Sequence, residues 1–388
     1  MNSRRAFIRT LGAGTAGAFA ASYLPRADAE TARWMEVFQQ TGLRPLLLHN
    51  NENPLGPGTK VLGAVRAFMR DGAPAGRYPG NPQQLREAIA AKYKISTDNV
   101  LVGCGSTQLL RTATHAFTSP SRGLVSGAPA YEECADYANL VGAPVKAIPL
   151  DPQLRDDLDA IVAAVAAMKD AGMVYLNNPN NPTATVHSGK AVSSFIDRVL
   201  QASPQTNLLI DEAYFDYVTD PGYATQIPIA LANPRVVVAR TFSKAHGMAG
   251  LRVGYMIGRP ETLRPMQQWQ YGTSMNALGV AAAIASIGDD ERIAQERNRN
   301  TEARDFTVRW FERAGFKVSD SQANFIFVDL KRPLAEFRDP CRERGVLVGR
   351  PFPPMTTHCR ISISTIDDMR KAVGVFGDVL GVKATQAA

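Results

Sequence analysis

One stretch of the chain, at residues 241–254, reads Thr241-Phe242-Ser243-Lys244-Ala245-His246-Gly247-Met248-Ala249-Gly250-Leu251-Arg252-Val253-Gly254. The apolar run at 236–239 before it predicts a buried strand. Burial lowers the pKa of a lysine because loss of solvent disfavours the charged form. An unprotonated Lys244 could then form a Schiff base with a carbonyl compound such as pyridoxal 5'-phosphate (PLP). The alternative is an ordinary lysine at a strand end whose ammonium group reaches solvent.

Ser243-Lys244 together with Gly250-Leu251-Arg252-Val253-Gly254 resembles the lysine segment of class I/II PLP-dependent aminotransferases, most closely the histidinol-phosphate aminotransferase branch. Further motifs follow in that family's order along nearly the whole chain after residue 45. The resemblance implies the α/β architecture of fold type I PLP-dependent transferases. This fold has a large domain with a mostly parallel sheet and a smaller α+β C-terminal domain.

The apolar patterns favour the same architecture. Strand-like runs alternate with helical patterns through the middle of the chain, which predicts a mostly parallel sheet with ligands beyond the carboxyl ends of its strands. After residue 290 a long charged helix leads into short strands. Strands are expected at 100–102, 123–125, 173–176, 207–210, 235–238, 324–329 and 360–364, and helices at 84–94, 108–117 and 157–169.

The same patterns divide the chain into four predicted segments. A leader covers residues 1–29, and an N-terminal arm at 30–56 packs on the small domain. The large PLP-binding domain covers 57–289, and the small C-terminal domain covers 290–388.

The resemblance implies a phosphate cup built from two motifs. Gly105, Ser106 and Thr107 follow a strand and open a helix, where free N–H groups bind an anion. Relatives carry an acidic pair where this chain has Thr107 and Gln108, but backbone donors do not depend on those side chains. Further phosphate contacts are implied for Thr241, Ser243, Arg252 and, from a neighbouring subunit, Tyr78.

The resemblance also implies contacts to the cofactor ring. Tyr131 would stack on the pyridine ring. Asn181 and Tyr214 would share its phenolic oxygen. Asp211 would pair with the ring nitrogen, and a buried carboxylate needs a cationic partner on physical grounds. Ala184 replaces a family glycine, so a positive φ at this position would strain the loop.

Three residues are candidates for substrate binding. The resemblance implies that Arg360 clamps the substrate's α-carboxylate, with Asn324 on a neighbouring strand and Asn53 nearby. For Arg350 two interpretations stay open: selection of the substrate's side chain, or a solvated charge. The predicted catalytic residues are Lys244, Asp211 and Tyr214. Lys244 would be both the cofactor anchor and the general base.

The predicted function is that of a PLP-dependent aminotransferase. It would move an amino group between an amino acid, or a histidinol-phosphate-like amine, and a 2-oxo acid, in a homodimer with shared active sites. A lyase, decarboxylase or cyclising enzyme on the same fold is an alternative, because PLP stabilises any Cα carbanion. A non-catalytic PLP-binding sensor is a minor one. A Rossmann dehydrogenase is a third alternative, but this chain lacks the Gly-x-Gly-x-x-Gly fingerprint of that class, and the class gives no role to Lys244.

Composition is that of a globular enzyme. The chain has 388 residues, of which 45% are hydrophobic and 20% charged, and a formal net charge of +7. No basic run with interleaved aromatic residues predicts nucleic-acid binding. The four cysteines, at 104, 134, 341 and 359, are scattered and contain no CxxC pair, so no metal site is expected and no disulfide can be assigned.

The first residues resemble a twin-arginine (Tat) signal peptide. Arg4 and Arg5 precede an Ala/Gly-rich apolar run at 11–24, and Ala27-Asp28-Ala29 places small residues where a signal peptidase cleaves. The run is too short and too rich in glycine for a stable membrane anchor. We therefore expect export by the Tat machinery, cleavage after Ala29 and a periplasmic protein.

Overall fold

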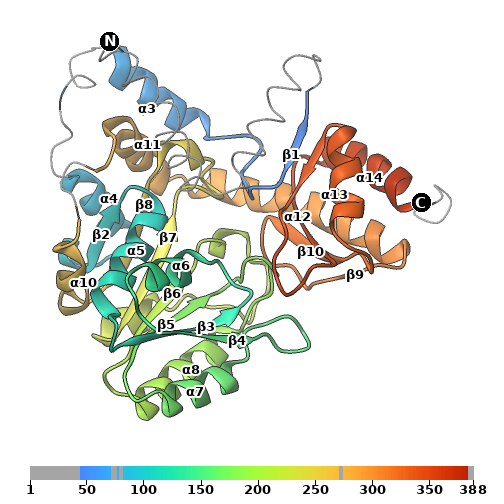
Figure 1. Ribbon diagram of the computed structural model, residues 1–388. Helices are drawn as coiled ribbons and strands as arrows, with labels where there is room; N and C mark the ends of the chain where they lie inside the picture. Colours follow the sequence, from blue (N-terminus) through green and yellow to red (C-terminus); the bar gives the residue numbers. More distant parts are fainter. Residues whose placement is uncertain (1–43, 71–76, 78–81, 271–273, 383–388) are drawn as a thin grey trace, which may run out of the picture.

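The computed structural model describes residues 44–70, 77, 82–270 and 274–382. A seven-stranded sheet with helices on both faces forms its larger part (Figure 1). The strand order is β2-β8-β7-β6-β5-β3-β4. Strands β3 to β7 run parallel to their neighbours within this group, and β8 is antiparallel to both β2 and β7. The strands are β2 (Val100–Gly103), β3 (Gly123–Ala128), β4 (Val145–Pro149), β5 (Ala171–Asn177), β6 (Asn207–Asp211), β7 (Val236–Thr241) and β8 (Gly254–Gly258).

The central strands are apolar without alternation because both faces of the sheet are covered. Along β6, Leu208 and Ile210 enter one hydrophobic core, whereas Leu209 enters the core on the opposite face. In β7, Val236 and Val237 divide between the two cores in the same way. Successive side chains of a strand point to opposite faces, so a strand buried on both sides needs a continuous apolar run.

Helices cover both faces of the sheet. The residues of α5, α6 and α10 pack into one core, and those of α4, α7, α8, α9 and α11 pack into the other. The helices of this part are α3 (Thr59–Arg70), α4 (Gln83–Tyr93), α5 (Gly105–Phe117), α6 (Glu133–Leu140), α7 (Leu158–Ala167), α8 (Gly189–Ala202), α9 (Ile227–Ala232), α10 (Pro260–Gln267) and α11 (Ala277–Ile287).

A second unit, which we call the C-terminal unit, follows from residue 290 and has its own hydrophobic core. Its antiparallel sheet has the order β12-β10-β9, and the strand β1 from the N-terminal side of the chain pairs in parallel with β11. Figure 1 accordingly shows β1, in blue, beside the orange and red elements. The elements are β1 (Leu46–Leu48), α12 (Asp290–Arg313), β9 (Lys317–Val318), β10 (Phe325–Asp329), α13 (Ala335–Glu343), β11 (Val346–Val348), β12 (His358–Ser362) and α14 (Ile366–Leu380).

The expected fold class is confirmed, with shifts at element ends. Strand β12 begins at His358 and ends at Ser362, two residues before the expected end. Helix α5 begins at Gly105, three residues earlier than expected, because the glycine-rich turn itself forms its first turn. Strands β1, β4, β8, β9 and β11 were not predicted. The predicted domain boundaries stay a prediction, and the leader and the arm before residue 44 lie outside the described residues.

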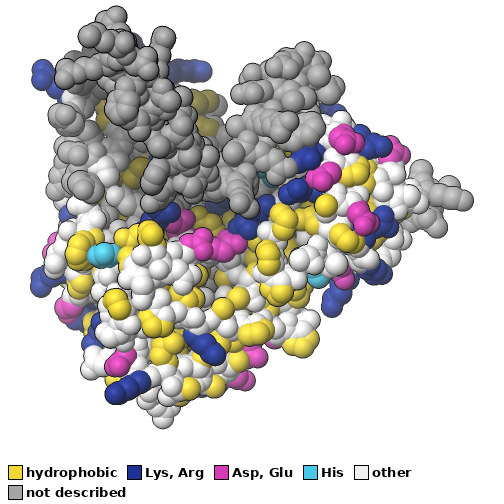
Figure 2. All heavy atoms as spheres, viewed as in Figure 1, with side chains coloured by type: hydrophobic (Ala, Val, Ile, Leu, Met, Phe, Trp, Pro, Cys, Tyr) yellow, Lys and Arg dark blue, Asp and Glu magenta, His cyan; other side chains and the backbone are white. Residues whose placement is uncertain are grey.

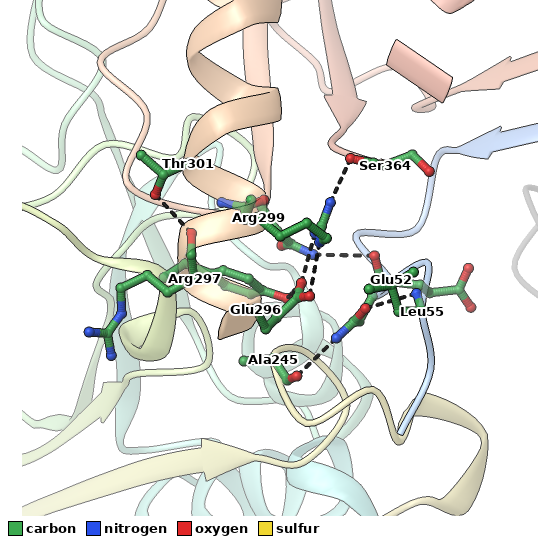
Figure 3. Close-up of polar contacts among 12 residues, drawn as sticks. Glu52, Leu55, Ala245, Glu296, Arg297, Arg299, Thr301 and Ser364 are labelled. Carbon is green, nitrogen blue, oxygen red and sulfur yellow. Dashed lines mark hydrogen bonds and ion pairs between the residues drawn. The ribbon is translucent and has the colours of Figure 1, made fainter. Parts of the chain in front are cut away.

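Contacts of α12 join the two units. Figure 3 shows Arg299 between the Glu296 side chain and Ser364. Arg299 donates to both Glu296 carboxylate oxygens, at 2.9 and 2.7 Å, and to the carbonyl oxygen of Ser364 at 2.6 Å. The fully buried Glu296 also accepts from the hydroxyl of Tyr217, which follows β6. A buried charge with this set of donors ties α12 to both sheets.

A second buried ion pair joins the ends of β6 and β7. Arg240 donates to Glu212 at 2.7 Å, and the two side chains are only 4% and 1% exposed. We expect Glu212→Gln to lower the free energy of unfolding by about 3–5 kcal/mol, because it leaves a buried guanidinium without its counter-ion. Urea unfolding followed by circular dichroism measures this change.

The matched control is Glu261→Gln. Glu261 accepts from Arg259 over the same 2.7 Å, but these side chains are 50% and 39% exposed. We expect a much smaller loss there, because water screens the pair. Equal losses in the two variants would show that burial does not determine the strength of the Glu212 pair.

Two further properties follow from the described residues. Their four cysteines are free thiols, three of them buried. Among the described residues, no helix combines the length and the apolar character needed to cross a membrane.

Candidate active site

A cavity of about 860 Å³ lies between the carboxyl ends of the parallel strands and the C-terminal unit. In Figure 2, acidic and basic side chains gather next to one another in the region between the two units. Most of the residues predicted to form the site line this one cavity: Ser106, Thr107, Tyr131, Asn181, Asp211, Tyr214, Thr241, Ser243, Lys244, Arg252 and Arg360.

The strand ends explain why these residues meet. Asp211 ends β6 and Thr241 ends β7, and these neighbouring strands pair in parallel. Lys244 follows three residues after Thr241. Ends of adjacent parallel strands meet at the same edge of a sheet, where ligands of open α/β sheets bind. Residues far apart in the sequence thus reach one wall of the cavity.

The first turn of α5 and Arg252 form one end of the cavity. Gly105 has a φ of +74°, and a Cβ atom there would lie 2.5 Å from Nη2 of Arg252, so only glycine allows this approach. Arg252 donates to the hydroxyl of Ser243 at 3.4 Å. A Cβ at Gly254 would lie 2.3 Å from the backbone nitrogen of Ser106. This combination of a helix N-terminus, hydroxyls and a guanidinium suits a phosphate group.

Asp211 lies deep in the cavity wall and is 2% exposed. One of its carboxylate oxygens accepts from the hydroxyl of Tyr175 at 2.9 Å, and the other accepts from the backbone N–H of Ala213 at 3.1 Å. Burial raises the pKa of Asp211 to about 6. Both of these partners are neutral, and among the described residues no cationic side chain forms a salt bridge with Asp211. The expected cationic partner is therefore not a side chain in the described part of the chain.

Lys244 has the lowered pKa that its predicted role requires. Burial, together with the positive charge of Arg360, lowers its pKa to about 8. Its ammonium nitrogen donates to the carbonyl oxygen of Asn50 at 3.3 Å and lies 5.6 Å from the centre of the Tyr214 ring. With this pKa, roughly a tenth of the molecules have an unprotonated Lys244 at pH 7, far more than an ordinary lysine with a pKa near 10.4 would give.

Arg360 comes from β12 in the C-terminal unit and is 8% exposed. It donates to the side-chain oxygen of Asn181 at 2.7 Å and to the carbonyl oxygen of His49 at 2.5 Å. Its buried Nε has no hydrogen-bond partner among the described residues. The hydroxyl of Tyr214 accepts from the side chain of Asn51 at 3.2 Å, and burial raises the pKa of this tyrosine.

Two predicted substrate-binding residues do not line this cavity. Asn53 donates to the carbonyl oxygen of Ala245, next to Lys244, and Asn324 donates to the carbonyl oxygen of Asn51 at 3.0 Å. Figure 3 shows Glu52 and Ala245 on adjoining segments at this junction. Both asparagines hold the segment before α3 against the site, so direct substrate contact stays a prediction. Tyr78 lies outside the described residues.

Ala184 has the positive φ that the comparison with a family glycine anticipates. Its φ is +62°, its backbone N–H donates to the carbonyl oxygen of Asn180 at 2.7 Å, and its methyl group is fully buried. The methyl group packs in a small apolar cluster with Tyr214 and Phe325. An alanine in this conformation is strained by roughly 1–2 kcal/mol, and its packed surroundings hold it there.

Sequence reasoning missed several residues of the site. Tyr175 lies in a buried apolar strand and resembles a core residue, yet it hydrogen-bonds Asp211. The side chain of Asn177 accepts from the backbone N–H of Asn181 at 2.9 Å and fixes that loop. Glu132 was not singled out either, and it meets Arg350, for which two interpretations had stayed open, across the cavity. A polar residue directly after a strand was a usable signal only for Asn177.

The residues present fit PLP. The end of the cavity at α5 suits its phosphate, Asp211 has neutral hydrogen-bond partners and would complement a protonated ring nitrogen, and Lys244 would hold its aldehyde carbon. Asn181 and Tyr214 line the cavity between these points. This arrangement defines the class of protein as a PLP-dependent enzyme with a lysine anchor.

Comparisons with known proteins give the family. Residues 44–376 match Aminotransferase class I and II, and the chain belongs to that family. It is 35% identical to a histidinol-phosphate aminotransferase of Symbiobacterium thermophilum over 92% of this chain and 96% of that protein. A second histidinol-phosphate aminotransferase, of Moorella thermoacetica, is 34% identical over 81% of this chain and 80% of the relative.

A solved structure supports the cofactor. The histidinol-phosphate aminotransferase of Sinorhizobium meliloti, in complex with pyridoxal-5'-phosphate, is 26% identical and superposes with a TM-score of 0.81. The alignment covers 89% of this chain and 94% of that one. The chain is thus a PLP-dependent aminotransferase of fold type I.

Proposed function

We propose that this aminotransferase takes its amino group from a donor whose carboxylate binds Arg360, and passes it to a 2-oxo acid bound in the same way. The observation that carries this proposal is the buried guanidinium of Arg360, which lines the cavity and whose Nε has no partner among the described residues. A planar guanidinium binds a carboxylate through two parallel hydrogen bonds. A substrate carboxylate would thereby fix the orientation of Cα relative to Lys244.

Each residue of the site then has a proposed task. Bound PLP would supply an aldehyde carbon for the amino group and a protonated ring that withdraws electrons from the donor's Cα. Lys244 would take the proton from Cα with Nζ, for which a pKa of about 8 is suitable near neutral pH. Asp211 would keep the ring nitrogen protonated, and Asn181 with Tyr214 would orient the ring.

A visible absorption spectrum tests the proposal. The band of the bound cofactor should disappear on addition of a donor amino acid and return on addition of a 2-oxo acid. A band that persists while product accumulates would instead favour a lyase or decarboxylase. Loss of the band with no return on addition of any 2-oxo acid would contradict reversible transfer.

Histidinol phosphate is a second candidate donor, and the names of the two relatives favour it. The same spectral titration with histidinol phosphate tests this donor. A lack of response would exclude it without affecting transfer from amino acids.

We also propose a homodimer with shared active sites. The family resemblance of the Tyr78 segment supports it, and so does apolar surface on α3, where Leu62 and Met69 are 40% and 49% exposed. Light scattering during gel filtration should give the mass of two chains. A monomer with full activity would contradict shared sites.

The last part of the proposal concerns the cellular location of the protein. Arg4 and Arg5 with the cleavage pattern ending at Ala29 support Tat export to the periplasm. We expect Arg4→Lys combined with Arg5→Lys to retain the protein in the cytoplasm, measured by fractionation and immunoblotting. In the unchanged protein, N-terminal sequencing should begin at Glu30. Unchanged export of the double variant would remove the Tat assignment.

A further inference from the structure

An ion pair crosses the mouth of the active-site cavity. Arg350, which follows β11 in the C-terminal unit, donates to a carboxylate oxygen of Glu132 at 2.6 Å, and Glu132 directly precedes α6 of the sheet unit. The two side chains are 38% and 37% exposed, and both line the cavity. A half-exposed ion pair contributes little to stability. Because both side chains line the cavity, the pair can instead affect which substrates enter it.

The pair stands close to the proposed carboxylate clamp. The guanidinium carbons of Arg350 and Arg360 lie 4.3 and 5.0 Å from the centre of the same ring, that of Phe352. The two guanidinium groups are therefore close enough for a long side chain, on a substrate whose carboxylate binds Arg360, to reach Arg350 and Glu132 with its tip, which we call the far end. The buried Nε of Arg360 has no hydrogen-bond partner among the described residues and could donate to the substrate's carboxylate.

The charged side chains that the C-terminal unit and the sheet unit present to the cavity determine which chemical group is accepted at the far end of the substrate. Arg350 by itself would attract a carboxylate or phosphate, but Glu132 already neutralises it. The two other arginines on this side of the cavity, Arg338 and Arg342, share the carboxylate of Asp339. Asp136, one turn further along α6, also lines the cavity, and its pKa is raised by burial and by the negative charge of Glu132. Glu133 pairs with Arg111, also on the sheet unit. Near the far end, the acidic wall thus keeps carboxylate oxygens within reach of a ligand.

We propose that Glu132 is a specificity-determining residue that neutralises Arg350 and offers a carboxylate to the far end of the substrate, so that donors ending in a cationic group are preferred over donors ending in a carboxylate or phosphate. This inference rests on the proposed binding of the donor's α-carboxylate by Arg360. An anionic far end has to displace Glu132 from Arg350 and then lies beside an uncompensated carboxylate. A cationic far end adds an attraction without breaking the pair.

The test compares three donors of similar length in the PLP-loaded enzyme: L-lysine, L-norleucine and L-2-aminoadipate. We expect the wild-type kcat/KM to be higher for L-lysine than for L-2-aminoadipate. In Glu132→Gln the ratio of L-2-aminoadipate to L-lysine should rise at least about tenfold, because the amide neither neutralises Arg350 nor attracts an ammonium group. L-Norleucine should change by less than about threefold, since it has no far-end charge.

Two further variants separate specificity from structure. Glu261→Gln is the matched control, since it removes a carboxylate from an exposed ion pair, that with Arg259, which does not line the cavity, and the donor ratio should stay near the wild-type value. In Arg350→Gln, adding Glu132→Gln should no longer raise kcat/KM for L-2-aminoadipate, because the guanidinium that it would release is gone.

The outcomes distinguish this inference from the function on which it rests. No transfer from L-norleucine in the wild-type enzyme would count against the proposed function itself. Normal transfer from L-norleucine with an unchanged donor ratio in Glu132→Gln would overturn only the role of Glu132. An equal fall in kcat/KM for all three donors would show that the ion pair merely holds the two units together, and that also overturns the proposal.

Discussion

Lys244→Ala is expected to abolish amino transfer and to remove the visible band of the bound cofactor, while the fold is kept. Loss of the general base alone should lower kcat by about 10³-fold or more, and loss of the covalent anchor adds to that. The fold should survive because, within the described part of the chain, the Lys244 side chain makes a single hydrogen bond, to the carbonyl oxygen of Asn50 at 3.3 Å. Steady-state rates, the absorption spectrum and circular dichroism measure these three quantities.

The control for this variant is Lys190→Ala. Lys190 is an exposed lysine on α8, on the other side of the sheet from α5, and its loss should leave both the rate and the spectrum unchanged. Retention of wild-type turnover by Lys244→Ala would contradict the role of Lys244 outright.

The parts of the fold that were predictable are those in which local sequence agrees with the final environment. Strands β6 and β7 are continuous apolar runs because both of their faces are buried. The candidate residues Asp211 and Thr241 were identified through the family resemblance, and each lies at the end of such a run. Strand β8, which contains Gly254 and Gly258, carries no comparable signal. Its first glycine is required by the approach of Ser106, a contact that only the folded structure creates.

The missed parts of the site depend on partners that are distant in sequence. Glu132 and Arg350 are separated by 218 positions. Glu132 reads as an ordinary surface charge, and the sequence leaves open whether Arg350 selects the substrate's side chain or is a solvated charge. Tyr175 reads as a core residue, since its strand is buried throughout. No periodicity or spacing encodes such pairs, because they arise only when β12, β11 and the end of β3 are brought to one cavity. The family resemblance identified single residues and not their mutual contacts.

Asp211→Asn is expected to lower amino transfer by about 10²–10³-fold, the usual cost of removing one pre-organised electrostatic partner. The amide cannot balance the positive charge of a protonated ring nitrogen, so the withdrawal of electrons from the donor's Cα weakens. PLP should still bind through Lys244 and the phosphate cup. The matched control is Asp216→Asn, which replaces an acidic residue of the same segment that does not line the cavity.

Asp211→Asn, which should lower amino transfer, should raise the free energy of unfolding of the cofactor-free protein. Burial raises the pKa of Asp211 from 3.8 to about 6, so the unfolded chain loses this proton at a lower pH than the folded protein does. The contribution of Asp211 to stability therefore falls as the pH rises between these two values, by up to about 3 kcal/mol. Asp211→Asn removes this penalty. In urea unfolding of the cofactor-free proteins, the variant should be the more stable at pH 8, and its advantage should vanish toward pH 4. A stability advantage of Asp211→Asn that is independent of pH would mean that ionisation of Asp211 is not its source. If the unchanged protein became the more stable of the two after loading with PLP, the ring nitrogen would be identified as the cation that compensates this carboxylate.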